Sequence, residues 1–192
     1  MCGIFRHAAL RGWCLRVEGG ARRVRKQFPF IAAGAMLASL VFAAPAAAVD
    51  DCTINGTDGS DSVDMVLVGE VFCGGAGNDH VGFNFGTVKG GQGDDSVVLN
   101  FGSFEGGNGN DSAGENHGTF AGGKGNDDLS SNFASGTFFG GHGNDSVWSN
   151  EGTVEGGPGD DVVSNNFGTF RGGPGTDSVL TDWDGIFEPG PQ

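Results

Sequence analysis

The sequence predicts an all-β fold, a parallel β-roll or β-solenoid of about eight coils with 16–18 residues in each coil. Three observations lead to it: the density of glycine, a hexapeptide that occurs seven times, and apolar columns that repeat with it. Of the 39 glycines, 34 lie from Val49 onward. Glycine at that density costs too much entropy inside helices, and its spacing is not the every-third-residue spacing of collagen.

Residues 1–48 are predicted to be a cleaved secretory signal peptide. The run 28–44 is apolar and uncharged, follows Arg22, Arg23, Arg25 and Lys26, and precedes small residues that suit cleavage after Ala48. A membrane anchor is the alternative, but the run is shorter than the roughly 20 residues of a span. Residues 1–23 are long for a basic leader, and a start at Val24 would give one of ordinary length. We therefore expect a secreted, extracellular protein with no membrane span after cleavage.

Charge divides the chain at the same place. Through Ala48 there are seven Arg or Lys residues and one Glu, whereas from Val49 onward there are 23 acidic and three basic residues. A segment with a net charge of −20 repels phosphate, which excludes a nucleic-acid partner. Acidic, glycine-rich chains are often disordered, but a fixed repeat register argues against disorder here.

Residues 49–73 are predicted to be an N-terminal cap and a degenerate first coil. Cys52 and Cys73 remain after cleavage, and in an oxidising compartment they are expected to form a disulfide. It would close a loop of about 20 residues, worth roughly 3 kcal/mol. A metal or redox pair is the alternative, but it lacks C-x-x-C spacing and nearby histidines.

Residues 74–182 are predicted to form the repeat roll. The hexapeptide GGxGxD begins 16 residues after the previous copy, except for one step of 18 residues after Gly122. A weaker copy, GTDGSD, occupies 56–61. Residues 183–192 are expected to cap the roll, with Phe187 over the core. The seven strict copies begin at Gly74, Gly90, Gly106, Gly122, Gly140, Gly156 and Gly172.

Three further columns repeat with the hexapeptide. Two residues after each Asp comes a small apolar residue, such as Val81, and five residues after most of them comes Asn, such as Asn84. The next turn is N-x-G, followed by Thr or Ser and then Phe or Val. Sixteen residues suffice for two short strands and two turns, with the apolar columns inside and threonines such as Thr119 outside.

Stacked coils would place the aspartates in one column about 5 Å apart, where carboxylates repel each other. Cations between them would relieve this repulsion. Carboxylates and backbone carbonyls suit Ca²⁺, whereas Mg²⁺ needs tighter octahedral geometry and zinc prefers His or Cys. His80, His117 and His142 fall in different columns, and we expect them to be exposed.

The unit GGxGNDxVx resembles the GGxGxDxUx nonapeptide of the RTX, or haemolysin-type, calcium-binding repeats. The resemblance covers about 72–187 and implies a right-handed parallel β-roll with Ca²⁺ bound between loops. Two buried apolar side chains per coil make only a thin core, so we expect folding to depend on Ca²⁺. The resemblance also implies that the loop aspartates, together with backbone carbonyls of the GGxGxD loops, are the metal ligands. These aspartates are Asp61, Asp79, Asp95, Asp111, Asp127, Asp145, Asp161 and Asp177.

Two departures from the family shape the functional prediction. The second half of each coil is a seven-residue N-x-G-T-F element, so calcium is expected along one edge only, at no more than seven sites. The leader is N-terminal, whereas many family members use a C-terminal secretion signal. No nucleophile with a His partner is evident, and we expect no catalytic residues but a non-enzymatic structural or interaction module. The alternative is a surface-adhesion or ice-binding solenoid that uses the Thr ladder, although Lys89, Glu105 and Arg171 interrupt that face.

Overall fold

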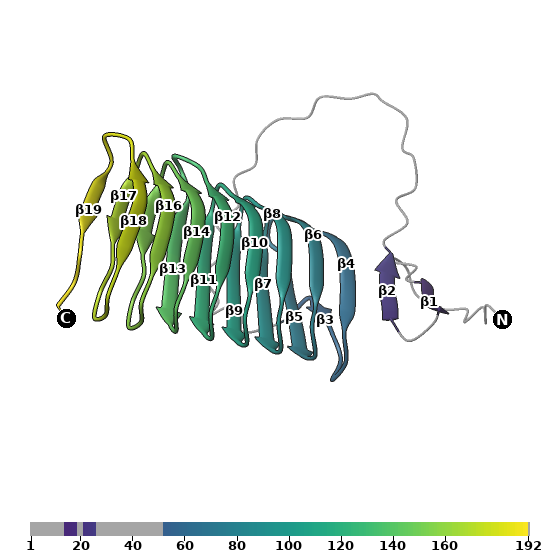
Figure 1. Ribbon diagram of the computed structural model, residues 1–192. Helices are drawn as coiled ribbons and strands as arrows, with labels where there is room; N and C mark the ends of the chain where they lie inside the picture. The colour runs from purple at the N-terminus through teal and green to yellow at the C-terminus, as the bar shows by residue number, and fades with distance from the viewer. Residues whose placement is uncertain (1–13, 19–20, 26–51, 192) are drawn as a thin grey trace, which may run out of the picture.

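The computed structural model describes residues 14–18, 21–25 and 52–191, and it confirms the predicted fold class. Two sheets, built mainly of parallel strands, face each other along a solenoid of about eight turns. Each turn has about 16 residues, and Figure 1 shows the row of stacked strands. The described ranges contain no helix that could cross a membrane. The apolar run of the predicted leader and its cleavage site after Ala48 lie outside the described residues.

The first sheet contains ten strands, of which the last eight are parallel and come one from each coil. Near the N-terminus β1 pairs antiparallel with β2, and β2 pairs parallel with β4. Of these three strands, β1 and β2 lie within the predicted leader. The strands are β1 (Cys14–Glu18), β2 (Ala21–Arg25), β4 (Asp61–Val66), β6 (His80–Asn84), β8 (Ser96–Asn100), β10 (Ser112–Asn116), β12 (Asp128–Asn132), β14 (Ser146–Asn150), β16 (Val162–Asn166) and β18 (Ser178–Asp182).

The second sheet contains nine strands, all parallel. They are β3 (Ile54–Asn55), β5 (Val71–Ala76), β7 (Thr87–Gln92), β9 (Ser103–Asn108), β11 (Thr119–Lys124), β13 (Thr137–His142), β15 (Thr153–Glu155), β17 (Thr169–Arg171) and β19 (Ile186–Glu188). The last of them, β19, shows that the predicted cap continues the second sheet and stacks Phe187 on Phe170 with ring centroids 5.1 Å apart.

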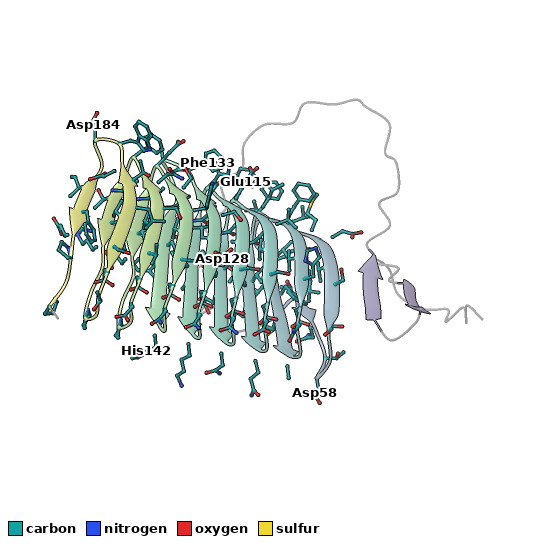
Figure 2. The ribbon with its side chains drawn as sticks, viewed as in Figure 1. Asp58, Glu115, Asp128, Phe133, His142 and Asp184 are labelled. Carbon is teal, nitrogen blue, oxygen red and sulfur yellow. A yellow bond between two sulfur atoms is a disulfide. The ribbon has the colours of Figure 1, made fainter. Side chains whose placement is uncertain are left out.

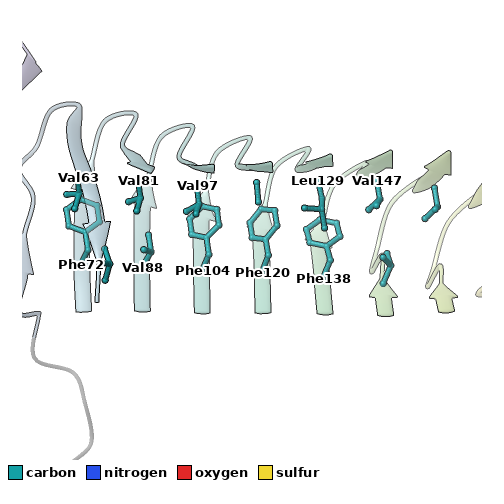
Figure 3. Close-up of a cluster of buried hydrophobic side chains, with 14 of the residues drawn as sticks. Val63, Phe72, Val81, Val88, Val97, Phe104, Phe120, Leu129, Phe138 and Val147 are labelled. Atoms are coloured by element: carbon teal, nitrogen blue, oxygen red, sulfur yellow. The ribbon is translucent and has the colours of Figure 1, made fainter. Parts of the chain in front are cut away.

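The core consists of two facing columns, as the repeat predicts. Ala113 pairs in register with Val97 and Leu129, and Phe120 pairs with Phe104 and Phe138. All six are buried, and Figure 3 shows the two columns pointing toward each other between the sheets. Alternation along each strand then turns Thr119 and its equivalents outward, where they are half-buried.

The glycine pair of the hexapeptide belongs to a strand in most coils, although the sequence predicts a turn there. In β5, β7, β9, β11 and β13 the strand continues through both glycines. The strands β15 and β17 end before the glycine pair, and in these two coils the pair is followed by Pro158 and Pro174. Proline has no backbone N–H to donate to a ladder, which accounts for the shorter strands.

The predicted disulfide is confirmed. Cys52 and Cys73 are joined with their Cα atoms 5.8 Å apart. The bond connects the chain just before β3 to β5, so it secures the degenerate first coil to the second.

Candidate functional site

The loop aspartates lie at one long edge of the roll, next to the first strand of each coil. Asp79, Asp95, Asp111, Asp127, Asp145 and Asp161 are each at most 3% exposed. Their backbone places them in register because the following strands pair residue for residue. The sequence prediction of a stacked aspartate column is therefore correct.

Glycines make room for these carboxylates in two ways. The second and third glycines of each loop, for example Gly75 and Gly77, have positive φ angles of 104° and 94°. The first glycine does not, but a Cβ on Gly74 would collide with Oδ2 of Asp79 and with the carbonyl oxygen of Gly90. Two oxygens from successive coils thus approach the same spot, and only a glycine leaves it open.

One oxygen of each carboxylate serves the fold. Oδ1 of Asp95 accepts a hydrogen bond of 2.8 Å from the backbone N–H of Asp79, and the same bond recurs from coil to coil. The equivalent bonds in the other coils are between 2.7 and 3.1 Å long. Asp61 N and Asp79 Oδ1 are 2.7 Å apart, and Asp161 N and Asp177 Oδ1 are 3.1 Å apart. Each aspartate therefore reaches back toward the preceding coil with a fixed orientation.

The other oxygen, Oδ2, is buried and has no hydrogen-bond partner in seven successive loops of the described chain. Buried polar atoms are almost always paired, and leaving one unpaired costs about 1–3 kcal/mol, more when it is charged. A regular column of seven such atoms is therefore the feature of this fold that most needs a partner. These atoms belong to Asp79, Asp95, Asp111, Asp127, Asp145, Asp161 and Asp177.

Burial also makes these carboxyl groups hard to ionise. Removal from water is the largest effect, the backbone hydrogen bond opposes it, and neighbouring carboxylates add to it at most positions. The pKa is raised from 3.8 in six of the groups, including Asp79 and Asp145. It reaches about 7 in the other four, Asp95, Asp111, Asp127 and Asp161.

Asp61 differs from the other loop aspartates although it lies buried in the same column. Its Oδ2 accepts hydrogen bonds from the backbone N–H of Thr57 at 2.6 Å and from Thr57 Oγ1 at 3.0 Å. Thr57 occupies the place of the second glycine in the degenerate copy. The first loop thus supplies from its own chain the partner that the other seven loops lack.

A second polar column runs beside the aspartates on the exposed side of the loops. Asn78 Oδ1 accepts from the backbone N–H of Asp94 at 3.1 Å, and Asp94 Oδ1 accepts from Asn110 at 2.8 Å. These side chains point toward the following coil, opposite to the buried column. The exposed carboxylates of Asp94 and Asp160 add to the negative potential that raises the pKa of Asp95 and Asp161.

The donor set restricts what could bind. Within the described residues no three His, Cys, Asp or Glu side chains gather as a metal cluster. A cation would therefore be held by one carboxylate oxygen from a loop together with backbone carbonyl oxygens such as that of Gly90. This set of hard oxygen donors fits Ca²⁺ better than zinc, whose protein sites are built mainly from Cys and His ligands.

The three histidines of the roll do not belong to the aspartate column, and they occupy different positions of the coil. His80 and His142 are exposed, as predicted, but His117 is half-buried because its ring stacks between Phe101 and Phe133. The expectation that no nucleophile has a His partner needs correction, because Nδ1 of His80 lies 2.9 Å from Oγ of Ser96. The pair lies in an outward column that also carries Ser112.

No family model, curated protein or solved structure matches this chain. The fold is therefore defined by its own geometry, a parallel β-solenoid with about 16 residues per turn, a buried Asp column at one edge and a buried Asn column at the other.

Proposed function

We propose that this chain is an exported, calcium-binding β-roll of the RTX type, a non-enzymatic structural or interaction module whose folding is coupled to Ca²⁺. The observation that carries the proposal is the column of seven buried Oδ2 atoms without a partner. The ligands would be Asp79, Asp95, Asp111, Asp127, Asp145, Asp161 and Asp177, with loop carbonyl oxygens. We leave Asp61 out because Thr57 already satisfies its Oδ2.

The chain's own residues prepare such a site. The hydrogen bond to Oδ1 fixes the carboxylate, so that Oδ2 of Asp127 is held in place in the loop. The first glycine, here Gly122, leaves space beside it for the carbonyl oxygen of Gly140. A bound calcium ion supplies the positive charge that neutralises these oxygens.

Coupling to folding follows from the same arrangement. Folding without a cation buries the carboxylates and brings them together, which opposes the ionised state, as the raised pKa values show. An ion that binds only the folded roll stabilises it by mass action. We therefore expect the roll to be stable in calcium and weakened without it at neutral pH.

Circular dichroism and hydrodynamic radius of the chain, measured in chelator, in calcium and in magnesium, test this proposal. We expect calcium to convert an expanded chain into a compact β-rich one, and magnesium to be far less effective. The same compact, β-rich state in excess chelator at neutral pH would contradict it.

Export rests on the leader sequence and has its own test. We expect protein recovered from the medium to begin near Val49 and to contain the Cys52–Cys73 disulfide, which an intact mass under non-reducing conditions reveals. Retention of residues 1–48, or of all the protein inside the cell, would contradict export and would leave the calcium proposal standing.

A further inference from the structure

A strip of partly exposed aromatic rings follows the edge of the roll opposite the aspartate loops. The residue after each column Asn lies there, and four successive coils place Phe85, Phe101, His117 and Phe133 in one continuous stack; Phe85 and Phe101 are exposed, whereas His117 and Phe133 are half-buried. The ring centroids are 5.2, 4.7 and 4.1 Å apart and the planes are within 11° of parallel. We call these four residues the ring strip.

The ring strip is widened by apolar side chains on the outer face of the first sheet. Met65, Phe83 and Leu99 pair in register there, and Phe83 and Leu99 each lie two residues before a ring of the strip. Phe83 is 43% exposed and Phe101 is 45% exposed. Contiguous exposed apolar side chains of this kind are uncommon on a monomer and usually mark an interaction surface.

The edge with the aspartate loops carries more acidic side chains than the edge with the ring strip, because it holds the buried aspartate column and exposed residues such as Asp94 and Asp160. Figure 2 shows Phe133, Glu115 and Asp184 at the upper edge and Asp58 and His142 at the lower edge, where the aspartate loops lie. Nε2 of His117 lies 3.8 Å from the carboxylate of Glu115, so one of the few acids near the ring strip has a basic neighbour. Two copies that meet at the ring strips would keep their strongly acidic edges as far apart as possible.

The spacing of the strip fits a second copy of the same chain. Rings repeat at about the interval between stacked coils, and a second copy turned by 180° presents a similar interval over the four coils of the strip. Ring faces inside the stack cover each other, so the exposed parts are ring edges. These edges can pack against the edges of another ladder but offer no face on which a sugar ring could stack.

We propose that the roll forms a two-fold symmetric dimer through the ring strip, with a second copy of this chain as the occupant. A two-fold interface joins the same patch on both subunits, and the ring strip can meet its own copy in this way. The strip ends where Glu151 takes the ring position of the next coil, and rings resume with Phe167 and Trp183, whose centroids are 6.1 Å apart.

The residue at this interruption provides the test variants. Glu151 shows that the fold accepts Glu in a ring position, so Phe101→Glu should keep the fold while placing a charge inside the interface. Trp148→Glu is the matched control, because Trp148 is 67% exposed on the first sheet outside the ring strip. Glu151→Phe would bridge the interruption and lengthen the apolar strip.

Sedimentation equilibrium in calcium measures the outcome for chains prepared in the same way. We expect a wild-type dimer, a dissociation constant at least about tenfold higher for Phe101→Glu, and one below wild type for Glu151→Phe. Trp148→Glu should match wild type. A wild-type monomer at concentrations up to about 100 μM would overturn the proposal. Equal weakening by Phe101→Glu and Trp148→Glu, or no change with Glu151→Phe, would also overturn it.

Discussion

The two buried polar columns that border the core, one of asparagines and one of aspartates, are built on the same coil spacing but satisfied differently. Nδ2 of Asn84 donates to Oδ1 of Asn100 at 2.7 Å and to the carbonyl oxygen of Ser103 at 2.8 Å. The next coils repeat this pattern. In the aspartate column Oδ1 is paired and Oδ2 is not.

The difference arises because the side chain of Asn carries an NH₂ group where that of Asp carries a second oxygen. An amide carries both donors and an acceptor, so a stack of amides can satisfy itself, whereas an ionised carboxylate only accepts. The asparagine edge therefore needs nothing from outside the chain. The aspartate edge needs a positive charge or a proton, and we expect the stability of the roll to depend on the solution through this edge alone.

Replacing a buried Asn of the asparagine edge by Asp should have the largest effect on the stability of the roll. Asn116→Asp removes the donor to Asn132 Oδ1 and to the carbonyl oxygen of Thr137, and it buries an unpaired charge among acceptors. We expect a loss of about 3–5 kcal/mol in the free energy of unfolding, measured by urea denaturation in saturating calcium. The control is Asn165→Asp on the outer face, which should cost little; equal losses would mean that the two edges are not different in kind.

The pH dependence without metal should be the next largest effect. The pKa of Asp95, Asp111, Asp127 and Asp161 is about 7 in the folded chain, above its ordinary value of 3.8. A carboxyl whose pKa is higher in the folded state stabilises that state when protonated. Stability in chelator should therefore be greatest below about pH 4 and fall as the pH rises through 7.

We expect the free energy of unfolding in chelator to fall by more than about 1.4 kcal/mol per pH unit, the slope for a single proton, in urea denaturation measured from pH 4 up to the pH at which the metal-free roll unfolds without urea. The exposed Asp94 and Asp160 face the same groups and add to their repulsion. Calcium should remove or reverse the trend because the ion binds the charged form. A flat profile in chelator would show that these carboxyls ionise without cost.

Replacing one loop aspartate by Asn should have a smaller effect, which weakens calcium binding but stabilises the metal-free roll. Asp127→Asn keeps the acceptor for the backbone N–H of Asp111 and removes the charge. We expect weaker calcium binding but a metal-free roll more stable by about 1–3 kcal/mol. Asp128→Asn is the control, since Asp128 is exposed and bonded to Ser146 Oγ. Destabilisation of the metal-free roll by Asp127→Asn would count against an unpaired charge at Oδ2.

The smallest effect should come from the one loop that satisfies itself. Asp61→Asn leaves an oxygen to accept from Thr57, so we expect a change within about 0.5 kcal/mol and an unchanged calcium midpoint. Urea denaturation checks the stability, and calorimetric titration with calcium checks the midpoint. A shift as large as that for Asp127→Asn would place Asp61 among the ligands.

Much of the fold could be predicted because the repeat fixes it. A constant spacing between copies sets the register, and alternation around Phe120 and Thr119 then decides which side chains enter the core. The repeat also placed the aspartates in one column. Local chemistry that differs from coil to coil was harder to predict, as the shortened strands beside Pro158 and Pro174 show.

The details of the candidate site depended on atoms that a sequence does not place. The sequence could not show that Oδ1 serves the backbone and leaves Oδ2 alone, nor that Thr57 satisfies Asp61. The sequence does contain a signal for the ring strip, because Phe85, Phe101 and their equivalents each follow an Asn of the repeated column. The contact between His80 and Ser96 arises only from strand pairing between neighbouring coils.

The central claim is that the aspartate edge needs a cation because seven carboxylate oxygens lack a partner. Its most direct test is equilibrium dialysis with metal analysis, combined with circular dichroism in chelator, on a variant in which all seven aspartates are Asn. We expect the wild type to bind several calcium ions, and the variant to bind almost none while keeping its β-structure in chelator at pH 7. Calcium binding equal to wild type, or a variant that still unfolds without calcium, would contradict the account. The positions changed are Asp79, Asp95, Asp111, Asp127, Asp145, Asp161 and Asp177.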